Sequence, residues 1–425
     1  MSNSKKLITR AIPADWEVKK IKDVCDIIGG GTPSRSKMEY YESGTIPWIK
    51  TGELNQKYIL DAKERITEIA LQESSARLIP ENSVLIAMYG ATTGRISITK
   101  IEVATNQACC AMISKGEFDP EFLYYSLTLN KKKIIAMGIG GAQLNISQQV
   151  IRDLEIPFPS QGEQYKISSI LSSVDEVIAN TESIIEQVEK VKRGLMEQLF
   201  TKGFGHKKFK RTNMGEIPWE WEVLSFNDVL SFIGSGITPK GGSNVYQLEG
   251  ISFIRSQNVY SDGLRLDNLV FISDVIHEKM RRSKVQEHDV LLNITGASIG
   301  RCAYVPSGFG EANVNQHVCI LRSNGKVHYK FFSYFINSLL GQRQISSKQN
   351  GQTREGLNYQ QIRAFKIPVP PMAEQEKISN IIESFNQKAN NERKKLNTLL
   401  YLRNGLMQRL LTGEIRVKFD KDEMT

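Results

Sequence analysis

An internal tandem repeat constrains the fold of this 425-residue chain more than any other feature of its sequence. Residues 12–18 (IPADWEV) return as 217–223 (IPWEWEV), and residues 81–95 return as 287–301. The offset between matching positions drifts from 205 to 211 through the first part of each repeat. From residue 151 to residue 203 it stays at 211, and 18 of these 53 positions are identical. Each repeat is therefore expected to hold a variable globular domain, whose loops absorb insertions, followed by a rigid element of fixed length.

The rigid element of each repeat is predicted to be a long helix. It follows a proline-rich segment, 156–159 in one repeat and 367–371 in the other, and about 40 residues without proline come next. Glu163 and Glu374 fall in the first predicted turns, where a carboxylate interacts favourably with the helix dipole. Apolar residues then recur in heptad steps at Ile167, Leu171, Val174, Ile178, Ile185, Val188, Leu195 and Leu199, and at Ile378, Ile382, Phe385, Ala389, Leu396, Leu399, Leu406 and Leu410.

A heptad seam of this length favours a coiled coil over an ordinary amphipathic core helix. At 1.5 Å per residue each helix would extend for about 60 Å. Because a globular domain separates the two helices in sequence, we expect them to pair with each other in antiparallel fashion. Lys192 and Arg403 interrupt the seam at the same step; they either fix the register or extend their charges to the edge of the coil. Residues 202–211, rich in Gly and Lys, are expected to form a solvated linker, with phosphate contact as the alternative.

Composition narrows the class of protein further. The formal charge is +9 and the pI is near 9.1, which mildly favours a nucleic acid or acidic partner. Five cysteines, an odd number without CxxC spacing, predict buried free thiols in a reducing compartment. No apolar run is long enough to cross a bilayer, and the first ten residues lack the apolar core of a signal peptide. We therefore expect a cytoplasmic protein that does not insert into membranes.

The sequence carries no recognisable catalytic motif. It has no GxxxxGK[ST] loop for nucleotide phosphates. Residues 232–236 resemble an FxGxG loop for S-adenosylmethionine, but the matching segment 25–31 lacks the Phe and no Asp/Asn-Pro-Pro-aromatic motif is present. The five histidines show no metal-ligand spacing. The sequence thus predicts a non-catalytic chain with no metal site.

Each variable domain is expected to combine short strands, at 83–88 and 289–294, with a helical segment, at 121–133 and 329–342. The Gly-rich turns at 90–95 and 296–301 offer backbone N–H groups and an Arg to an anion, or they are simple hairpins. Basic residues at strand ends and Asn-Gln pairs can contact DNA, or they are surface charges and structural amides. The candidate DNA-binding residues are Lys50, Thr92, Arg95, Asn106, Gln107, Arg255, Ser298, Arg301, Asn315 and Gln316.

On these motifs the chain resembles the specificity subunit of type I restriction-modification systems. The resemblance rests on the repeated Ile-Pro-x-x-Trp, the Gly-Thr-Pro and Gly-Ile-Thr-Pro turns, and the proline-rich segments that lead into Glu-Gln. The helix ends, Gly-Leu-Met at 194–196 and 405–407, add to it, so that the match covers residues 12 to 416. Pro159-Ser160 departs from the two prolines that the family often has, with little consequence.

The resemblance implies an α+β chain with two similar globular target-recognition domains and two long helices that form an antiparallel coiled coil. It implies domain bounds of 1–160 and 217–371, spacer helices at 161–200 and 372–412, a linker at 201–216 and a tail at 413–425. The implied partners are double-stranded DNA with a bipartite, asymmetric site, two methyltransferase subunits and two restriction/translocase subunits. S-adenosylmethionine, ATP and Mg²⁺ would bind those partner subunits, leaving no cofactor in this one. The alternative is a structural protein whose coiled coil joins two protein-binding domains.

Overall fold

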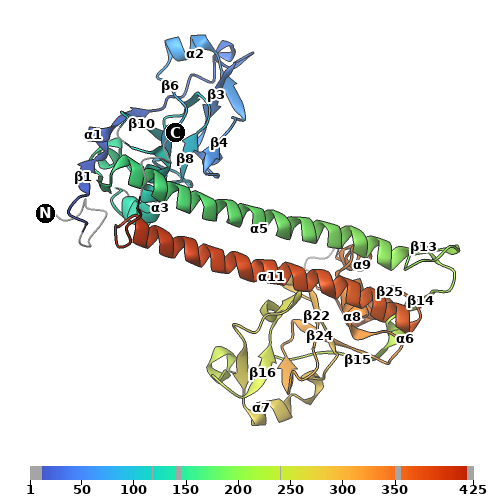
Figure 1. Cartoon of the computed structure of the whole chain (residues 1–425). Helices are drawn as coiled ribbons and strands as arrows, with labels where there is room; N and C mark the ends of the chain where they lie inside the picture. Colours follow the sequence, from blue (N-terminus) through green and yellow to red (C-terminus); the bar gives the residue numbers. More distant parts are fainter. Residues whose placement is uncertain (1–11, 117, 139–144, 240, 350–355, 419–425) are drawn as a thin grey trace. The chain divides into compact units, whose positions relative to one another are not determined.

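The computed structural model describes residues 12–116, 118–138, 145–239, 241–349 and 356–418. The chain divides into two compact units: residues up to 181 together with those from 395 onward form the first, and residues 182–394 form the second. Each unit contains one globular domain and one half of each of two long helices, α5 (Gln161–Thr201) and α11 (Met372–Leu410). Figure 1 shows each long helix as one continuous element.

The first domain is built on two sheets. One has the strand order β2-β10-β7-β8-β4 and the other β5-β3-β9-β6, while β1 pairs with β11 near the start of α5. The strands are β1 (Glu17–Lys20), β2 (Cys25–Gly29), β3 (Ile46–Ile49), β4 (Tyr58–Ile59), β5 (Glu64–Ile66), β6 (Leu78–Ile79), β7 (Val84–Ala87), β8 (Ile96–Thr99), β9 (Val103–Thr105), β10 (Cys109–Ser114) and β11 (Glu155–Phe158). The helices are α1 (Ile21–Val24), η1 (Met38–Tyr40), η2 (Thr51–Glu53), α2 (Glu68–Glu73), α3 (Pro120–Ala136) and α4 (Gln148–Arg152).

The second domain repeats this plan, with sheets β15-β24-β21-β22 and β19-β16-β23-β20 and the pair β14-β25. Its strands are β12 (Phe209–Thr212), β13 (Gly215–Pro218), β14 (Glu222–Ser225), β15 (Leu230–Ser235), β16 (Ile251–Ile254), β17 (Val259–Tyr260), β18 (Gly263–Leu264), β19 (Val270–Ile272), β20 (Lys284–Val285), β21 (Val290–Asn293), β22 (Cys302–Tyr304), β23 (Ala312–Val314), β24 (Val318–Ser323) and β25 (Lys366–Val369). Its helices are α6 (Phe226–Val229), η3 (Gly242–Val245), η4 (Ser256–Asn258), α7 (Asp274–Lys279), η5 (Arg281–Ser283), η6 (Gly296–Ser298), α8 (Tyr329–Asn337), α9 (Leu339–Ser347) and α10 (Tyr359–Ala364).

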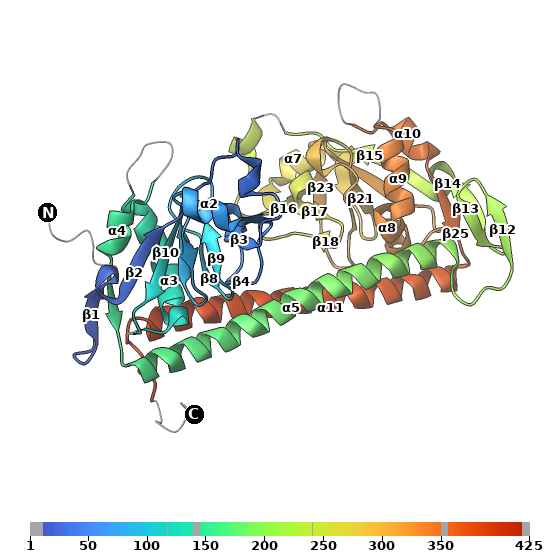
Figure 2. The same ribbon diagram turned by 90° about the horizontal axis from the view of Figure 1, so that it is seen from above.

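The two domains share an unusual pairing that random similarity would not produce. The sheets β5-β3-β9-β6 and β19-β16-β23-β20 each contain one parallel pair, β3 with β9 and β16 with β23, and their other pairs are antiparallel. The α+β tandem repeat predicted from the sequence is therefore confirmed in the topology. One helical layer covers the other sheet of each domain, and Figure 2 shows α3 and α8 between the sheets and the long helices. Phe200 of α5 packs against two rings of α8, Phe331 and Phe335, with centroids 5.2 and 5.6 Å apart.

The predicted heptad seam lies inward along both long helices. All sixteen of its apolar residues are buried or half-buried, because the same side chains meet the opposite helix and the domain cores. In the first unit Ile167 and Leu171 share a core with Met407 and Leu410. In the second unit Met196 and Leu199 share a core with Ile378 and Ile382. In each unit the beginning of one helix thus packs against the end of the other, which is the antiparallel arrangement predicted.

The two basic residues of the seam make cross-helix contacts. Arg403 Nε lies 2.7 Å from Asp175 Oδ1, an ion pair within the first unit. Lys192 Nζ donates to Asn386 Oδ1 at 3.1 Å within the second unit. Positions 175 and 386 correspond at the offset of 211, as do 192 and 403. Of the two interpretations left open by the sequence, these contacts favour residues that fix the register.

Two local predictions were wrong. The helix expected at 329–342 is broken into α8 and α9 at Ser338, whose extended backbone (φ −70°, ψ 164°) ends one helix and whose hydroxyl caps the next. The linker expected at 201–216 contains a hairpin, β12 with β13, in place of an irregular segment. In both places short-range hydrogen bonds determine the local structure, and the spacing of apolar residues does not predict them.

The five cysteines are all free and buried, as predicted. Burial raises the pKa of the Cys109 and Cys319 thiols to about 12, which leaves them protonated and unreactive at neutral pH. In the described part of the chain, no helix has the length and apolar character needed to cross a membrane.

Candidate nucleic-acid interface

A glycine-rich turn follows β2 in the first domain and β15 in the second, and it lies directly on a neighbouring strand. In the first domain the Gly31 amide donates to the carbonyl of Thr105 at 2.9 Å, and a Cβ on Gly30 would stand 2.2 Å from the carbonyl oxygen of Asn106. In the second domain a Cβ on Gly236 would stand 1.5 Å from the carbonyl oxygen of Val314. Only glycine permits this approach, which explains why both repeats carry it before Thr-Pro.

The turns place two predicted residues, Gln107 and Gln316, at the surface. Thr32 Oγ1 donates to Gln107 Oε1, and Thr238 Oγ1 donates to Gln316 Oε1, so the same hydroxyl–amide pair occurs in both domains. Both glutamine side chains are exposed. An exposed amide is the kind of group that can read a base edge.

The neighbouring asparagines serve the protein itself. Asn315 is 8% exposed, and its Oδ1 accepts from the amide of His317 at 3.1 Å. Asn106 is half-buried, and its Oδ1 is enclosed without a hydrogen-bond donor. This placement favours the structural alternative for Asn315 and leaves Asn106 with an unused acceptor.

The two strand-end cations are engaged by their own domains. Lys50 Nζ pairs with Glu64, and Arg255 Nη2 donates to the carbonyl of Asn268 at 2.8 Å. Lys50 stands at the end of β3 and Arg255 at the end of the matching strand β16, so their correspondence is confirmed. Their present contacts favour the alternative interpretation, ordinary surface charge.

The Gly-x-x-x-Gly-Arg turns are hairpin connections between antiparallel strands, β7 to β8 and β21 to β22. Gly94 and Gly300 have φ of 76° and 87° and donate to carbonyls of the preceding strands at 2.8 and 2.9 Å. Thr92 is half-buried in its turn, and Ser298 Oγ accepts from Asn293 Nδ2 at 3.1 Å.

The arginines that close these turns differ from each other. Arg95 makes no ion pair with any described carboxylate and lines a cavity of about 350 Å³ beside Lys57 and Lys131. Arg301 is exposed and lies 4.8 Å above the ring of Tyr260. The structure therefore brings the candidates Thr92 and Arg95 together in one turn, and Ser298 and Arg301 in another. Gln107 and Gln316 belong to the separate glycine-turn surfaces.

The side chains around the shared frame differ between the domains. Met88 donates its amide to the carbonyl of Ala108, and the matching residue Ile294 donates to the carbonyl of His317. His317 therefore occupies the place of Ala108. Its Nδ1 lies 2.5 Å from Thr295 Oγ1 and its Nε2 lies 3.1 Å from Gln316 Nε2. One frame thus presents an alanine in one domain and a polar histidine network in the other.

A profile of the family described as "Type I restriction modification DNA specificity domain" matches residues 13–190 and 218–401, most of the chain. The chain belongs to this family. The type I restriction enzyme MjaIX specificity subunit of Methanocaldococcus jannaschii is 29% identical, covering 96% of this chain and 95% of that protein. The EcoR124I/EcoR124II specificity subunit of Escherichia coli is 28% identical over 41% of this chain and 44% of its own length.

The fold of the family is also found in solved structures. The S subunit from M. genitalium has a TM-score of 0.61 at 18% identity, covering 95% of this chain and 98% of that one. A second structure, from work on complex assembly and conformational transition of the type I R-M system, has a TM-score of 0.57 at 16% identity, with 96% and 100% coverage. At these identities the likeness establishes the fold of this specificity-domain chain.

The Glu-Gln pair at the start of each long helix attaches the helix to its domain, a role beyond the helix-dipole effect that the sequence suggested. Gln164 Oε1 accepts from the amide of Asp119 at 3.0 Å, and Gln375 Oε1 accepts from the amide of His328 at 2.7 Å. Asp119 and His328 are the residues just before α3 and α8. The glutamines therefore fix the domain helices relative to the long helices within each unit.

The glutamates complete this attachment. Glu163 accepts from Trp16 Nε1 at 3.3 Å and from Arg416 Nε at 2.8 Å. Glu374 accepts from Trp221 Nε1 at 3.0 Å and lies 2.9 Å from His206 Nε2. In both units the segment after one long helix is thus held at the start of the other. The repeated Ile-Pro-x-x-Trp and Glu-Gln motifs could have indicated this pairing, since both recur at matched positions.

The polar contacts between domain and helix differ in part between the two units. In the first unit Glu121 of the domain accepts from Ser172 of α5 and from Lys57 Nζ, the latter at 3.0 Å, and Tyr125 of the domain donates to Asp175 of α5 at 2.6 Å. Burial alone would raise the pKa of Glu121, but hydrogen bonds from Ser172 and Tyr58 outweigh it and lower that pKa.

In the second unit the carboxylate belongs to the helix. Glu383 occupies the position of Ser172 and accepts from two tyrosines of the domain, Tyr334 and, at 2.9 Å, Tyr304. Burial is the main cause that raises the pKa of both phenols, so they remain donors at neutral pH.

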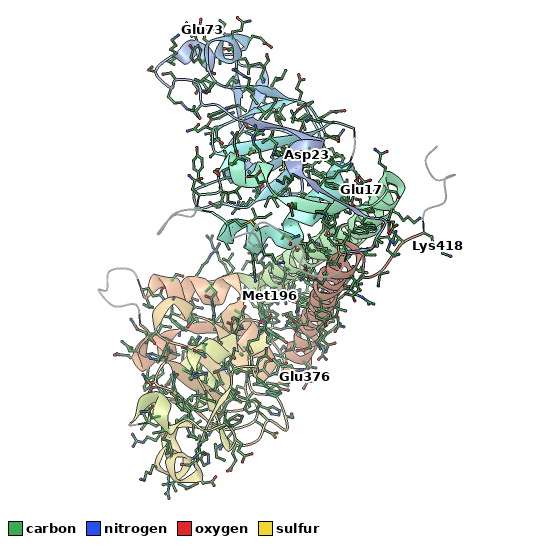
Figure 3. The ribbon with its side chains drawn as sticks, turned by 90° about the vertical axis from the view of Figure 1, so that its left-hand side faces the viewer. Glu17, Asp23, Glu73, Met196, Glu376 and Lys418 are labelled. Atoms are coloured by element: carbon green, nitrogen blue, oxygen red, sulfur yellow. The ribbon has the colours of Figure 1, made fainter. Side chains whose placement is uncertain are left out.

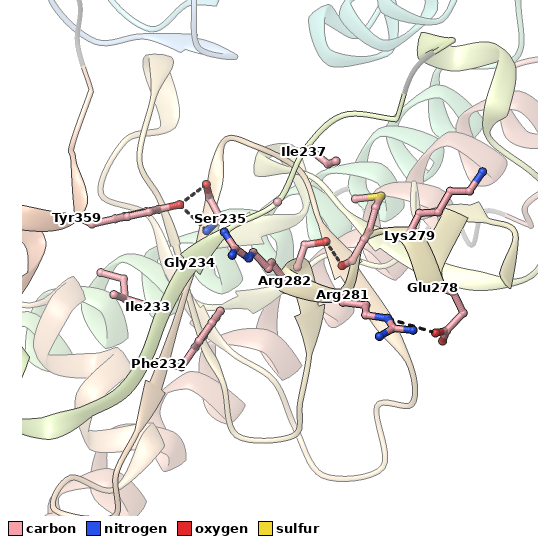
Figure 4. Close-up of a pocket in the computed structure, with 13 residues that line it drawn as sticks. Phe232, Ile233, Gly234, Ser235, Ile237, Glu278, Lys279, Arg281, Arg282 and Tyr359 are labelled. Atoms are coloured by element: carbon pink, nitrogen blue, oxygen red, sulfur yellow. Dashed lines mark hydrogen bonds and ion pairs between the residues drawn. The ribbon is translucent and has the colours of Figure 1, made fainter. Parts of the chain in front are cut away.

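Sequence reasoning missed the basic side chains at the end of α7. Lys279, Arg281 and Arg282 are exposed, and they line a groove whose other wall is the second glycine-rich turn (Figure 4). The charge run was visible in the sequence, but its place beside the turn depends on the pairing of distant strands. Figure 1 shows α7 at the end of the second domain away from α11.

Proposed function

We propose that this chain is the DNA-reading subunit of a type I restriction-modification enzyme. Each domain would read one half of a bipartite, asymmetric site in double-stranded DNA. The observation that supports this most is the shared frame with unlike side chains. Where the first domain has Tyr89 and Ala108 beside Gln107, the second has Thr295 and His317 beside Gln316. Two readers with one architecture and different polar groups fit two different half-sites.

We further propose that the long helices set the number of base pairs between the half-sites. The helices contain 41 and 39 residues without a break, and 1.5 Å per residue gives about 60 Å for each. Removing one heptad from both would shorten them by about 10 Å, about three base-pair steps of duplex. An unchanged spacer in such a variant would mean that partner subunits determine the distance.

We propose that the chain scaffolds two methyltransferase and two restriction/translocase subunits and performs no catalysis itself. S-adenosylmethionine, ATP and Mg²⁺ would be bound by those partners. The fold shared with a structure from work on complex assembly supports this arrangement. We also propose a cytoplasmic location, because the proposed DNA substrate would be found there. The purified chain is expected neither to methylate DNA nor to hydrolyse ATP; methyl transfer by the chain alone would contradict the proposal.

Equilibrium binding of the purified full chain to duplex DNA of random sequence tests the reading function at its simplest level. Because phosphate contacts release counterions, the logarithm of the association constant is expected to fall linearly with the logarithm of salt concentration. A chain that binds no duplex at low salt would contradict the proposal. That result would favour the alternative, a coiled coil that joins two protein-binding domains.

A further inference from the structure

The groove beside the second glycine-rich turn has no role in the contacts described above. It has a volume of about 830 Å³ and is lined by residues 232–237, residues 278–283 and Tyr359. Tyr359 Oη lies 2.7 Å from the backbone nitrogen of Ser235 and 2.6 Å from its hydroxyl, which holds one wall in place. All of these residues belong to the second unit.

The lining of this groove is strongly basic. It contains Lys279, Arg281 and Arg282 but only one carboxylate, Glu278. Glu278 is itself shared between Lys284, at 2.5 Å, and Arg281, at 4.0 Å. Among described residues no carboxylate forms an ion pair with Lys279 or Arg282. Figure 4 shows Arg281 turned toward Glu278 and Arg282 extending toward the turn that carries Ser235.

The first domain has no such charge at the matching positions. Helices α2 and α7 begin at Glu68 and Asp274, and strands β6 and β20 begin at Leu78 and Lys284, so the offset is 206 throughout this segment. Lys279, Arg281 and Arg282 therefore correspond to Glu73, Ser75 and Ala76. Figure 3 shows Glu73 at the extremity of the first domain.

The cations near Glu73 are engaged within the first domain. Glu73 accepts from Lys37 Nζ at 2.8 Å, and Glu64 accepts from Arg35 Nη2 at 2.6 Å. Arg77 turns its guanidinium back to the carbonyls of Ser74 and Ala76. Residues 68–78 thus contain one cation, Arg77, whereas the matching residues 274–284 contain four Lys and Arg side chains.

We propose that this basic groove, the surface lined by residues 232–237, residues 278–283 and Tyr359, binds the phosphodiester backbone of DNA. The second domain would then contribute more of the salt-dependent binding free energy than the first. The proposal rests on the DNA-reading function proposed above. Three exposed cations beside a surface glutamine fit a backbone that runs past the base-reading group.

The test compares two triple variants of the full chain, each of which loses three positive charges. The first is Lys279→Ala, Arg281→Ala, Arg282→Ala. The control is Lys190→Ala, Arg193→Ala, Lys388→Ala, which removes exposed cations from the long-helix portions of the same unit. The probe is a duplex of random sequence, and the measured quantity is the slope of log K against log salt concentration.

We expect the groove variant to reduce the magnitude of the slope by about 2 to 3, since each phosphate contact contributes about 0.9. The control should keep the wild-type slope. Equal slopes for wild type and groove variant, with clear binding by both, would overturn the basic groove but leave the DNA-reading proposal intact. Absence of salt-dependent binding by the wild type would overturn the DNA-reading proposal itself.

Single variants guard against loss of folding in the triple variant. Arg282→Ala and Lys279→Ala each remove one exposed side chain without an ion pair, and circular dichroism should show wild-type melting for both. Each is expected to reduce the slope by about 0.9. Wild-type slopes in both folded single variants would contradict the proposal as directly as the triple variant would.

Discussion

The first and second domains match in strand order except for β4, which the second domain's sheet lacks, and they share a parallel pair and a glycine-rich turn, yet they present different chemistry to solvent. The frame is fixed by features that tolerate little change: a buried glycine contact, a Trp–Glu hydrogen bond and a Gln that fixes a helix start. The surface at the end of α2 or α7 differs between the domains. Glu73, Ser75 and Ala76 of the first domain correspond to Lys279, Arg281 and Arg282 of the second. A duplicated reader can therefore diverge in specificity without altering how it is held.

The largest expected effect of a single substitution is at the glycine-rich turns, where the two domains should respond alike. Gly236→Ala would force a Cβ to within 1.5 Å of the Val314 carbonyl oxygen, and Gly30→Ala to within 2.2 Å of that of Asn106. We expect each to cost about 3 kcal/mol or more in the free energy of unfolding, because backbone must move. Urea unfolding measures this, with Gly52→Ala as the control, since a Cβ there meets nothing within 4 Å. A neutral Gly236→Ala would show that the turn is not the common frame.

Substitutions at the two Trp–Glu attachments should have the next largest effect on stability, and each should act on one unit only. Glu163→Ala removes the acceptor of the Trp16 indole and one of the two carboxylates that Arg416 contacts, and Glu374→Ala removes the carboxylate that the Trp221 indole and His206 share. Each substitution is expected to cost about 2 to 4 kcal/mol in the free energy of unfolding, since a buried or half-buried acceptor of several hydrogen bonds is lost.

Hydrogen exchange shows which unit each of these two substitutions destabilises. Protection should fall in the first unit for Glu163→Ala and in the second for Glu374→Ala. Glu176→Ala and Glu376→Ala, exposed residues on the same helices, serve as controls. Equal loss of protection in both units would contradict the assignment of each attachment to one unit.

Acid should weaken the contact that Glu121 makes between the first domain and α5. The folded pKa of Glu121 lies below its unfolded value of 4.5, so the carboxylate contributes stability above that pH and loses it as the pH falls through the folded pKa. We expect Glu121→Gln to lose about 1 to 3 kcal/mol at pH 7. The difference from wild type should shrink as the pH falls below 4.5.

Urea unfolding at several pH values measures this dependence. Glu68→Gln, an exposed change in the same domain, should match wild type throughout. A Glu121→Gln penalty that stays constant from neutral to acidic pH would show that packing, and not charge, holds this contact.

The smallest expected effect is at the seam. Asp175 and Arg403 form an ion pair, whereas Asn386 and Lys192 share one hydrogen bond. Double-mutant cycles with alanine should give a coupling of about 1 to 2 kcal/mol for the first pair, which joins two charges, and about 0.5 kcal/mol for the second, which joins one charge to a neutral amide. A larger coupling for the Asn386 pair would reverse this ranking of the two units.

The sequence predicted the parts of this structure that depend on periodicity and repetition. The seam from Ile167 to Leu199 could be found because heptad spacing is a local pattern, and the duplication followed from matched segments. The break at Ser338 and the hairpin beginning at Phe209 escaped because they depend on single capping and pairing hydrogen bonds.

The candidate interface was harder to predict, since the partners of its charges are distant in sequence. Lys50 and Arg255 looked like free cations at strand ends, and each is engaged by a residue more than ten positions away. The sequence left Gln107 and Gln316 open between DNA contact and structural amides, and it did not indicate the threonines that hold them at the surface. The positive charge at Lys279, Arg281 and Arg282 stands out only when these residues are compared with Glu73, Ser75 and Ala76, the matching residues of the first domain.

Genome-wide mapping of methylated adenines tests the central proposal most directly. It compares cells that contain this gene with its partner subunits, cells that lack only this gene, and cells in which both long helices are shortened by one heptad. We predict an asymmetric motif of two separated blocks that disappears without the gene, and whose gap shrinks by about three base pairs in the shortened variant. A single uninterrupted motif, or a methylation pattern that survives loss of the gene, would contradict the account.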